Sequence, residues 1–337
     1  MKIDANSVTF EPQDMAFVKK FGILKATEMA LDYHAEHPNL PFLYDAEQLA
    51  GFLGISRGEL NDIVNHIQKE YKETRLPKKD GTYRSLCVPS IRLRFCQDPI
   101  KEKILPQLPV SKFATAYQKG STTRGNAEPH IGKKFLLKLD ITDFFGSITF
   151  EQVQRTAFNT RYVSRQVGYL LTSLCCKDDS LPQGAATSPA LSNIVMYRFD
   201  DYIGRWCSQR QIAYTRYCDD MTFSANRPLY GVYQKVKTML REMGFELNES
   251  KTHFIGNDNR QSVTGLVVNE KLSIPSGYKR DLRQEVYYAL KFGVEDSVLH
   301  GHRSDFVEDG RPICCPTYML HLMGKVQYVL QIEPENL

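Results

Sequence analysis

The sequence has no long hydrophobic run. None of its apolar stretches approaches the roughly 18 residues that suggest a membrane-spanning helix. Charged side chains are spread through the first 30 residues, where a secretory signal needs an apolar centre. We therefore expect no membrane span, no signal peptide and no membrane partner.

The sequence also lacks a CxxC pair, the spacing typical of zinc sites and of thioredoxin-type redox sites. Its eight cysteines are separate or directly adjacent, as in Cys175-Cys176 and Cys314-Cys315. A disulfide framework is one alternative, but we favour reduced thiols and therefore expect a cytoplasmic protein.

Internal repeats and low-complexity segments are absent as well, which excludes solenoids and disordered tails. The 337 residues are 42% hydrophobic and 24% charged, and they include 21 Gly and 16 Pro. This composition is typical of a globular protein and excludes collagen, coiled coils and wholesale disorder. The length favours about two compact units.

Charge is unevenly distributed along the chain. The formal net charge is only +4, yet residues 72–138 contain 15 Lys and Arg against 5 Asp and Glu. This segment therefore carries +10, and the remainder carries −6. A basic segment in a near-neutral chain is typical of a protein that binds a phosphate backbone, although a solvated charged face is the simpler alternative.

The apolar spacing predicts an α+β chain built around an antiparallel sheet. Helices are expected over 46–52, 57–71, 91–105, 233–243, 278–292 and 318–332, with a long helix opening at Ser188-Pro189. Strands are expected over 135–141, 212–217, 221–225 and 261–268, with a hairpin starting at Leu76. Ser56 and Ser188 are candidate N-caps, and Gly244 is a candidate helix stop.

Three aspartates stand where strands end. Asp140 follows a buried strand, and Asp219 and Asp220 lie at a hairpin turn 79 positions later. Strands of one sheet can bring these side chains together, and such carboxylates cannot all ionise without a cation nearby. Two Mg²⁺ ions would resolve this conflict and would suit an in-line phosphoryl displacement. The alternative is that each aspartate only caps a turn.

Four ordered segments resemble the palm motifs of reverse transcriptases. They read FLLKLDITDFF at 135–145, LPQGAATSPALSN at 181–193, YTRYCDDMTFSA at 214–225 and LNESKT at 247–252. Residues 217–220 fit the family's YxDD. NAEPH at 126–130 and VTG at 263–265 match the NAxxH and VTG elements of retron reverse transcriptases. The resemblance runs from about residue 76 to 268.

The resemblance implies a right-hand polymerase fold with fingers, palm and a small helical thumb. We expect an N-terminal helical extension over 1–70, fingers over 71–137, a palm over 138–268 and a thumb over 269–337. The catalytic core would be about 71–268. No room remains for a fused RNase H, protease or endonuclease domain.

The resemblance also supplies roles for the acidic cluster and its neighbours. Asp140, Asp219 and Asp220 would hold the two Mg²⁺ ions, with the carbonyl of Ile141 as a further ligand. Lys251 matches the lysine that protonates the pyrophosphate leaving group, unless it is an ordinary surface lysine. The cysteine of YxDD, Cys218, should not bind magnesium, which prefers oxygen.

A second group of residues is expected at the incoming dNTP. Arg84 and either Lys78 or Lys79 would clamp the triphosphate. Phe145 would be an aromatic steric gate against a ribose 2'-OH, with core packing as its alternative. The remaining residues expected at the nucleotide are Asp143, Gln183 and Gly184, the last because glycine permits a close backbone approach.

The two retron elements are expected near RNA or primer. Asn126 and His130 could contact RNA directly, but we favour a hydrogen-bonded brace between fingers and palm. Val263, Thr264 and Gly265 are expected to form a strand edge beside the primer, or else a simple bulge.

The function implied is that of a bacterial retron reverse transcriptase. Such an enzyme copies part of a cognate structured noncoding RNA, starting from a guanosine 2'-OH, into a branched RNA-DNA hybrid (msDNA). It acts in antiphage defence beside a separate effector protein. The alternatives are a reverse transcriptase of a group II intron or a diversity-generating element, and a noncatalytic RNA-binding scaffold with a polymerase fold.

Overall fold

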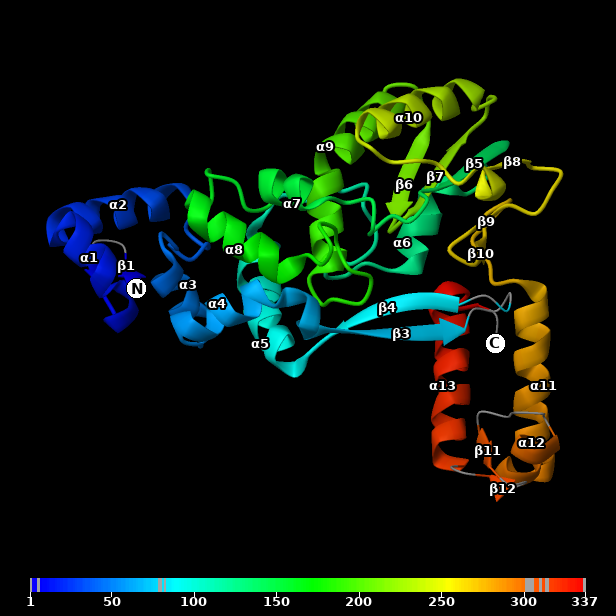
Figure 1. Cartoon of the computed structure of the whole chain (residues 1–337). Helices are drawn as coiled ribbons and strands as arrows, with labels where there is room; N and C mark the ends of the chain where they lie inside the picture. The colour runs from blue at the N-terminus through cyan, green and yellow to red at the C-terminus, as the bar shows by residue number, and fades with distance from the viewer. Residues whose placement is uncertain are drawn as a thin grey trace.

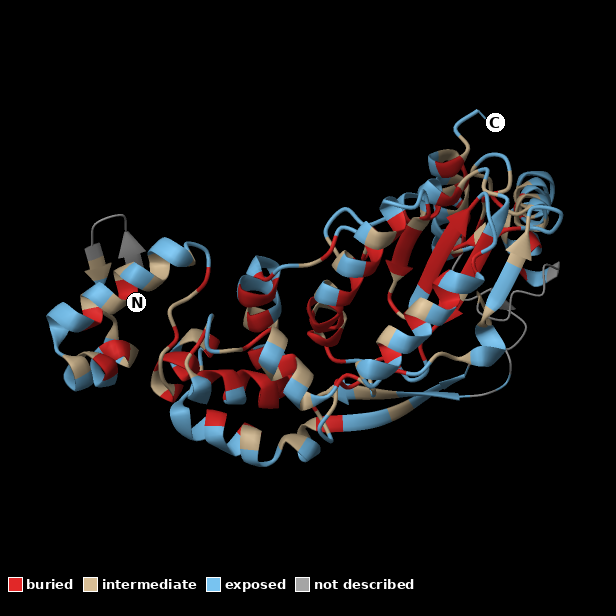
Figure 2. Ribbon diagram, turned by 90° about the horizontal axis from the view of Figure 1, so that it is seen from above, coloured by how far each residue is buried: buried red, intermediate tan, exposed pale blue. Residues whose placement is uncertain are grey.

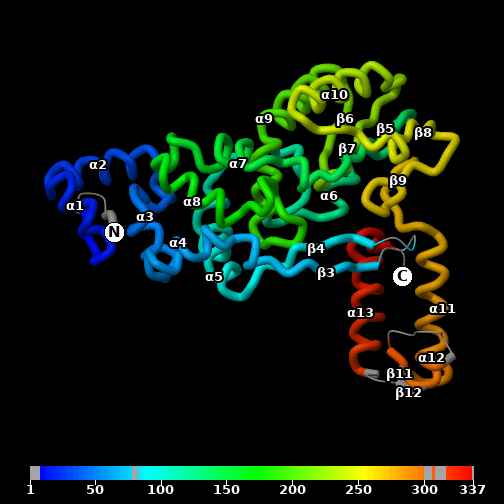
Figure 3. Tube along the Cα trace, in the orientation of Figure 1, coloured from blue at the N-terminus to red at the C-terminus, as the bar shows by residue number. Residues whose placement is uncertain are grey.

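The computed structural model describes residues 2–4, 7–77, 81, 83–300, 306–308, 311–312 and 315–335. Figure 1 shows the N-terminal helices at one side, a central sheet region, and a separate group of helices near the C-terminus. Figure 3 follows the same path as a continuous trace. No helix in these ranges is long and apolar enough to cross a bilayer.

A four-stranded antiparallel sheet forms the centre of the protein, in the order β6-β7-β5-β8. Its strands are β5 (Phe135–Asp140), β6 (Ala213–Tyr217), β7 (Asp220–Ala225) and β8 (His253–Gly256). Strand β5 pairs with β7 on one side and with β8 on the other, and its apolar side chains are mostly buried. The predicted strand and the predicted hairpin with carboxylates at its tip are confirmed.

Two helices pack beside this sheet, α9 (Ser188–Ser208) and α10 (Tyr230–Glu242) (Figure 1). Gly244 follows α10 with a φ of +84°, the left-handed conformation that favours glycine at a helix end, as expected. The prediction of Ser188 as N-cap is wrong by one residue. Thr187 is the N-cap of α9, and the Ser188 hydroxyl instead donates to the carbonyl of Pro182 at 2.7 Å.

A long hairpin and several helices lie on the N-terminal side of the sheet. The predicted helix over 57–71 is too long, since α4 ends at Asn65 and Tyr71 begins a strand. The buried hydroxyl of Tyr71 accepts a hydrogen bond from Gln97, and its backbone pairs with Pro89. The elements are α3 (Ala46–Leu53), α4 (Arg57–Asn65), β3 (Tyr71–Pro77), β4 (Tyr83–Pro89) and α5 (Ile91–Pro99). Ser56 caps α4 as expected.

One hydrophobic core runs through most of these elements. It joins apolar residues of the 40–71 region to the sheet and to α9 and α10. Helices α7 (Phe150–Thr156) and α8 (Arg165–Cys175) belong to it too, and α8 packs against α3, α4 and α5. Figure 2 shows this buried interior in red. The packing thus crosses the expected boundaries at residues 70 and 138, which remain predictions.

The N-terminal region is not purely helical. A short hairpin, β1 (Lys2–Asp4) with β2 (Ser7–Thr9), precedes α1 (Met15–Phe21) and α2 (Ile23–Glu36). Short helical turns elsewhere are Pro12–Asp14, Ile67–Glu70, Ile100–Ile104, Leu105–Gln107, Thr123–Ala127 (α6), Glu128–His130 and Glu249–Lys251.

The C-terminal helices form a second hydrophobic core together with Val263, Leu266 and Val268. Its elements are α11 (Ser276–Phe292), α12 (Val294–His300), β11 (Val307–Glu308), β12 (Arg311–Pro312) and α13 (Cys315–Ile332). The single strand predicted over 261–268 is instead a small hairpin of β9 (Ser262–Val263) and β10 (Leu266–Val267).

Candidate active site

A cleft of about 740 Å³ lies between the β3–β4 hairpin and one end of the central sheet. It brings together most of the residues that the sequence places at metal and nucleotide, although they come from distant parts of the chain. Those that line it are Arg84, Asp140, Ile141, Asp143, Phe145, Gln183, Asp219, Asp220 and Lys251. Lys78 and Lys79 lie outside the described residues.

The three aspartates meet at the end of the sheet. Asp140, the last residue of β5, is the direct register partner of Asp220, the first residue of β7. The backbone N–H of Ile141 donates to the carbonyl of Asp219 at 3.2 Å, which holds the β6–β7 turn against β5. Partial burial and the neighbouring Asp219 carboxylate raise the pKa of Asp220. Three carboxylates are therefore close together at this end of the sheet.

Lys251 supplies the nearest positive charge. Its ammonium donates to both carboxylate oxygens of Asp140 at 3.0 Å, and this contact raises the pKa of Lys251. Asn248 anchors the same loop, because its backbone N–H donates to the carbonyl of Asp140 at 2.8 Å. The expected LNESKT lysine therefore reaches the acidic cluster.

The donor atoms in this corner suit a hard divalent cation. Among the described residues, no three Asp, Glu, His or Cys side chains are gathered closely enough to hold a metal ion by themselves. Asp140, Asp219 and Asp220 instead face an open cleft, with Ile141 beside them. Carboxylate and carbonyl oxygens that leave coordination positions free fit Mg²⁺, which keeps waters and takes substrate phosphates as ligands.

The loop after β5 contains the predicted gate. Phe145 is half-buried, so that its ring both lines the cleft and packs on the core. Asp143 has a φ of +41°, a conformation rare outside glycine. A Cβ on Gly146 would lie 2.2 Å from the Asp143 carboxylate, so a larger residue there would push the Asp143 side chain aside.

The LPQG segment packs against the β3–β4 hairpin. Gln183 lines the cleft, and its carbonyl accepts a hydrogen bond from the backbone N–H of Cys87 on β4 at 2.7 Å. Gly184 does not line the cleft. Its φ is +123°, and a Cβ there would lie 2.9 Å from the carbonyl oxygen of Cys87. The close approach that this glycine permits in the structure is to β4. The expected approach to a nucleotide stays a prediction.

We predict that Gly184→Ala destabilises the protein. The added methyl group clashes with backbone that cannot rotate away, so the free energy of unfolding should fall by about 1–3 kcal/mol. Gly231→Ala is the matched control, because nothing lies within 4 Å of a Cβ at this position on α10. Urea denaturation of both variants is the measurement, and equal stabilities would contradict the clash.

The NAxxH residues lie in the interior. Asn126 and His130 are 2% and 0% exposed. The His130 ring bonds to the hydroxyls of Ser224 at 2.7 Å and Thr215 at 2.9 Å, and burial lowers its pKa to about 3, so the ring is neutral. Direct RNA contact by these side chains does not fit their burial. The His130 ring joins the 126–130 segment to β6 and β7, which fits the favoured alternative of a hydrogen-bonded brace, and the brace between fingers and palm stays a prediction.

The VTG residues are the last residue of β9 and the turn that follows it. Thr264 and Gly265 have φ values of +46° and +83°, the pattern of a tight two-residue hairpin turn. The Thr264 hydroxyl donates to the carbonyl of Thr123 at 3.1 Å and accepts from the Asn126 amide at 3.4 Å. Val263 is fully buried. The two retron elements are thus in direct contact with each other.

Three further residues in the cleft escape the sequence argument. Tyr117 donates its hydroxyl to Cys218 Sγ at 3.2 Å and is half exposed. Lys177 is paired with Glu73 on β3 at 2.8 Å, and Asn248 lies beside Asp140. Of the three, Asn248 alone belongs to a segment that the sequence singles out, LNESKT, although no role was expected for it.

Comparison with known families agrees with this geometry. Residues 76–268, more than half of the chain, match the family "Reverse transcriptase (RNA-dependent DNA polymerase)". The fold is the right-hand polymerase fold, and the activity is RNA-directed DNA polymerisation.

Curated relatives narrow the assignment. The chain is 31% identical to the retron Mx65 reverse transcriptase of Myxococcus xanthus over 321 residues, covering 88% of this chain and 70% of the relative. It is 28% identical to the retron Ec86 reverse transcriptase of Escherichia coli over 270 residues, covering 79% and 84%. The chain belongs to the retron-type reverse transcriptases.

Solved structures of telomerase are also similar in part. That of Candida albicans with a telomeric RNA fragment matches with a TM-score of 0.46 and 14% identity, covering 79% of this chain and 57% of that one. Apo telomerase of Candida tropicalis gives 0.46 and 11%, covering 77% and 56%. The chain spans a little over half the length of these telomerases.

Proposed function

We propose that this chain copies part of a cognate structured noncoding RNA into a branched RNA-DNA hybrid, primed from a guanosine 2'-OH. The observation that carries the catalytic part is the meeting of Asp140 with Asp219 and Asp220 at one end of a cleft that also contains Arg84, Phe145 and Lys251. Kinship with retron enzymes supports the RNA part.

Each side chain has a proposed task in the transfer step. Asp140, Asp219 and Asp220, with the carbonyl of Ile141, would hold two Mg²⁺ ions, which supply charge stabilisation for the attacking and leaving oxygens. Arg84 would bind the dNTP triphosphate, and Lys78 or Lys79 would join it. Lys251, which already holds a proton beside Asp140, would donate that proton to the leaving pyrophosphate.

The nucleotide would lie against the loop after β5. Only the backbone carbonyl of Gln183 is hydrogen-bonded to β4 in this contact. The side-chain amide can therefore donate to sugar or phosphate. Asp143 stands at the mouth of the cleft. The ring of Phe145 would occupy the space that a ribose 2'-OH needs, so only deoxynucleotides would fit.

We predict that Phe145→Val relaxes sugar discrimination. Removing the ring opens room for the 2'-OH, and the ratio of kcat/KM for dNTP over rNTP should fall by about 10- to 200-fold. Single-nucleotide extension with dATP and ATP gives this ratio. Phe135→Val, at the other end of β5, is the control and should leave the ratio unchanged. If Phe145 only packs the core, both variants will discriminate alike.

The branched product is tested by the nucleic acid that copurifies with the protein. Debranching followed by sequencing should yield DNA joined to an RNA guanosine through a 2'-5' linkage. Linear cDNA alone would instead favour a group II intron-like or diversity-generating enzyme. Absence of extension on any RNA template with Mg²⁺ would favour a noncatalytic scaffold.

The cellular role follows from the same kinship. We place the protein in the bacterial cytoplasm, acting in antiphage defence with a separate effector protein. The six cysteines whose side chains are described are free thiols, which fits a reducing compartment. A strain that carries the gene cluster should lose phage resistance when either the reverse transcriptase or the effector is deleted.

A further inference from the structure

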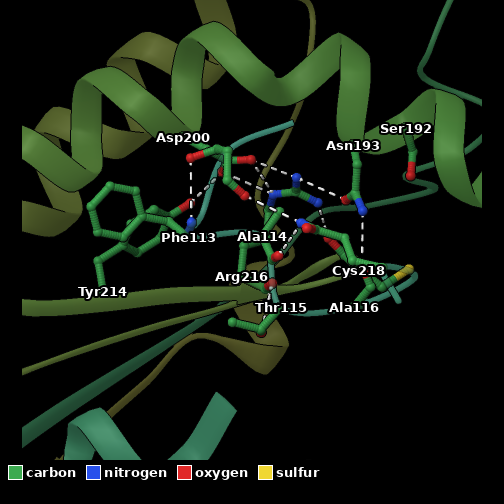
Figure 4. Close-up of polar contacts among 12 residues, drawn as sticks. Phe113, Ala114, Thr115, Ala116, Ser192, Asn193, Asp200, Tyr214, Arg216 and Cys218 are labelled. Carbon is green, nitrogen blue, oxygen red and sulfur yellow. Dashed lines mark hydrogen bonds and ion pairs between the residues drawn. The ribbon is translucent and has the colours of Figure 1, made fainter. Parts of the chain in front are cut away.

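Arg216, directly before the YCDD turn, is a fully buried cation (Figure 4). Its guanidinium forms an ion pair with the equally buried Asp200 of α9, with Nε 2.9 Å from Oδ1 and Nη2 2.5 Å from Oδ2. The free energy needed to desolvate two buried charges offsets much of the Coulomb attraction between them. A hydrophobic pair of similar volume often stabilises a protein equally well. The pair therefore calls for a role beyond stability.

The remaining donors of Arg216 point to that role. Nη1 donates to the carbonyl of Cys218 at 2.9 Å, and Nη2 donates to the side-chain oxygen of Asn193 at 3.1 Å. Cys218 has a φ of +62°, a left-handed conformation that a cysteine rarely adopts unaided. The bond to its carbonyl fixes the peptide plane that joins Cys218 to Asp219.

The turn is held from both sides as a result. Arg216 holds the carbonyl of Cys218, and the backbone N–H of Ile141 holds the carbonyl of Asp219. Two successive carbonyls are thus fixed in the segment that carries Asp219 and Asp220. The planar fork of an arginine can hold an aspartate, an amide and a carbonyl together, whereas the single ammonium of a lysine cannot span the same set.

The same residues tie this turn to the fingers side. The backbone of Arg216 bonds to Phe113 and Thr115, each at 2.8 Å, and the Asn193 amide donates to the carbonyl of Ala116 at 2.8 Å. Tyr117, next in the chain, reaches Cys218 Sγ. Figure 4 shows these contacts converging on Arg216 and Asn193.

We propose that Arg216 is a positioning residue that sets the orientation of the Cys218-Asp219 peptide, and hence of the Asp219 carboxylate, with Asn193 holding its guanidinium in place. The inference rests on the proposed catalytic role of Asp219. Arg216 itself touches no substrate, since it does not line the cleft.

The test compares Arg216→Lys with Tyr214→Phe in the full-length protein. The lysine keeps a cation for Asp200 but gives up the carbonyl of Cys218. Tyr214→Phe removes a 2.7 Å hydrogen bond to the same Asp200 and leaves the guanidinium contacts intact. Both should lower the melting temperature, so stability alone does not separate them.

The two variants are distinguished by single-turnover addition of one dNTP to a bound template-primer. The burst amplitude gives the fraction of enzyme that is active, so a loss of folded enzyme is not mistaken for a slower rate. Arg216→Lys should lower the maximal rate by about 10²-fold, the cost of a misplaced reacting group. Its apparent dNTP affinity should stay within about threefold, because the triphosphate contacts are untouched. Tyr214→Phe should keep the wild-type rate.

A wild-type rate in folded Arg216→Lys overturns the proposal. If that variant does not fold, Asn193→Ala takes its place, because it removes one anchor of the guanidinium and leaves the ion pair. It should slow the rate by about 10-fold, and an unchanged rate overturns the proposal equally. If Asp219→Asn also retains activity, the proposed catalytic site has failed, and the failure is not that of Arg216 alone.

Discussion

Replacing Asp219 with Asn should lower the rate of nucleotide addition by about 10³-fold or more. The carboxylate stands at the tip of the β6–β7 turn, beside Asp220 and opposite Asp140, in the cleft corner that fits a divalent cation. Losing one anionic ligand removes several kcal/mol of charge stabilisation in the transition state, and each 1.4 kcal/mol is a factor of ten in rate. Primer extension on an RNA template with Mg²⁺ measures the loss.

The fold should survive this change. Amide and carboxylate have the same shape, and removing one of several like charges relieves repulsion, so the melting temperature should stay level or rise. Asp201→Asn is the control, since Asp201 lies on α9 outside the cleft and pairs with Arg205 at 2.6 Å. An Asp219→Asn enzyme as active as the control would remove these aspartates from the chemistry.

The sequence was informative wherever local pattern and chain order both pointed the same way. The apolar run of β5 and the hairpin of β6 and β7 predict strand ends, and an antiparallel sheet then brings Asp140 to Asp220. LNESKT likewise brings Lys251 within 3.0 Å of Asp140. Each of these placements can be predicted from the direction of a strand and the position of a turn.

What the sequence did not indicate depends on packing between distant segments. Arg216 is charged, and the residues next to it in the sequence do not indicate that it is buried or that it pairs with Asp200, sixteen positions earlier. Tyr71 continues a helical spacing, yet its side chain packs beside Gln97 and its backbone enters a strand. Lys177 reaches the cleft because the segment after α8 lies beside β3, where Lys177 pairs with Glu73 at 2.8 Å. Tertiary context outweighed local propensity in each case.

Thr264-Gly265 is different, because a signal was present. Glycine is favoured in a two-residue hairpin turn because it adopts a positive φ readily, and Gly265 lies between Val263 and the apolar pair Leu266-Val267. The prediction of a single strand over 261–268 did not take this turn signal into account. The turn lets Thr264 reach Asn126, so NAxxH and VTG form one unit that joins the region before β5 to the β9–β10 hairpin.

The basic segment over 72–138 has the second large expected effect, on RNA binding. Many of its side chains are exposed, among them Lys72 and Arg75 on β3, Arg84 on β4, and Lys119. The β3–β4 hairpin extends away from the N-terminal helices, past the sheet end that contains the cleft (Figure 1). RNA that enters the cleft would therefore run along this hairpin, and its phosphates would displace bound counterions.

RNA affinity should consequently fall about 10³- to 10⁵-fold between 50 and 200 mM salt, the loss typical of six to ten phosphate contacts.

Lys72→Gln/Arg75→Gln should weaken binding at low salt and flatten the slope of log affinity against log salt by about 1.5, because each lost contact removes roughly 0.7 to 0.9. The matched control is Arg198→Gln/Arg241→Gln, two exposed arginines on α9 and α10. This pair removes the same charge away from the hairpin and should leave the slope unchanged. Filter binding across a salt series measures both. Equal slopes in the two double variants would show that net charge, and not the hairpin, attracts the RNA.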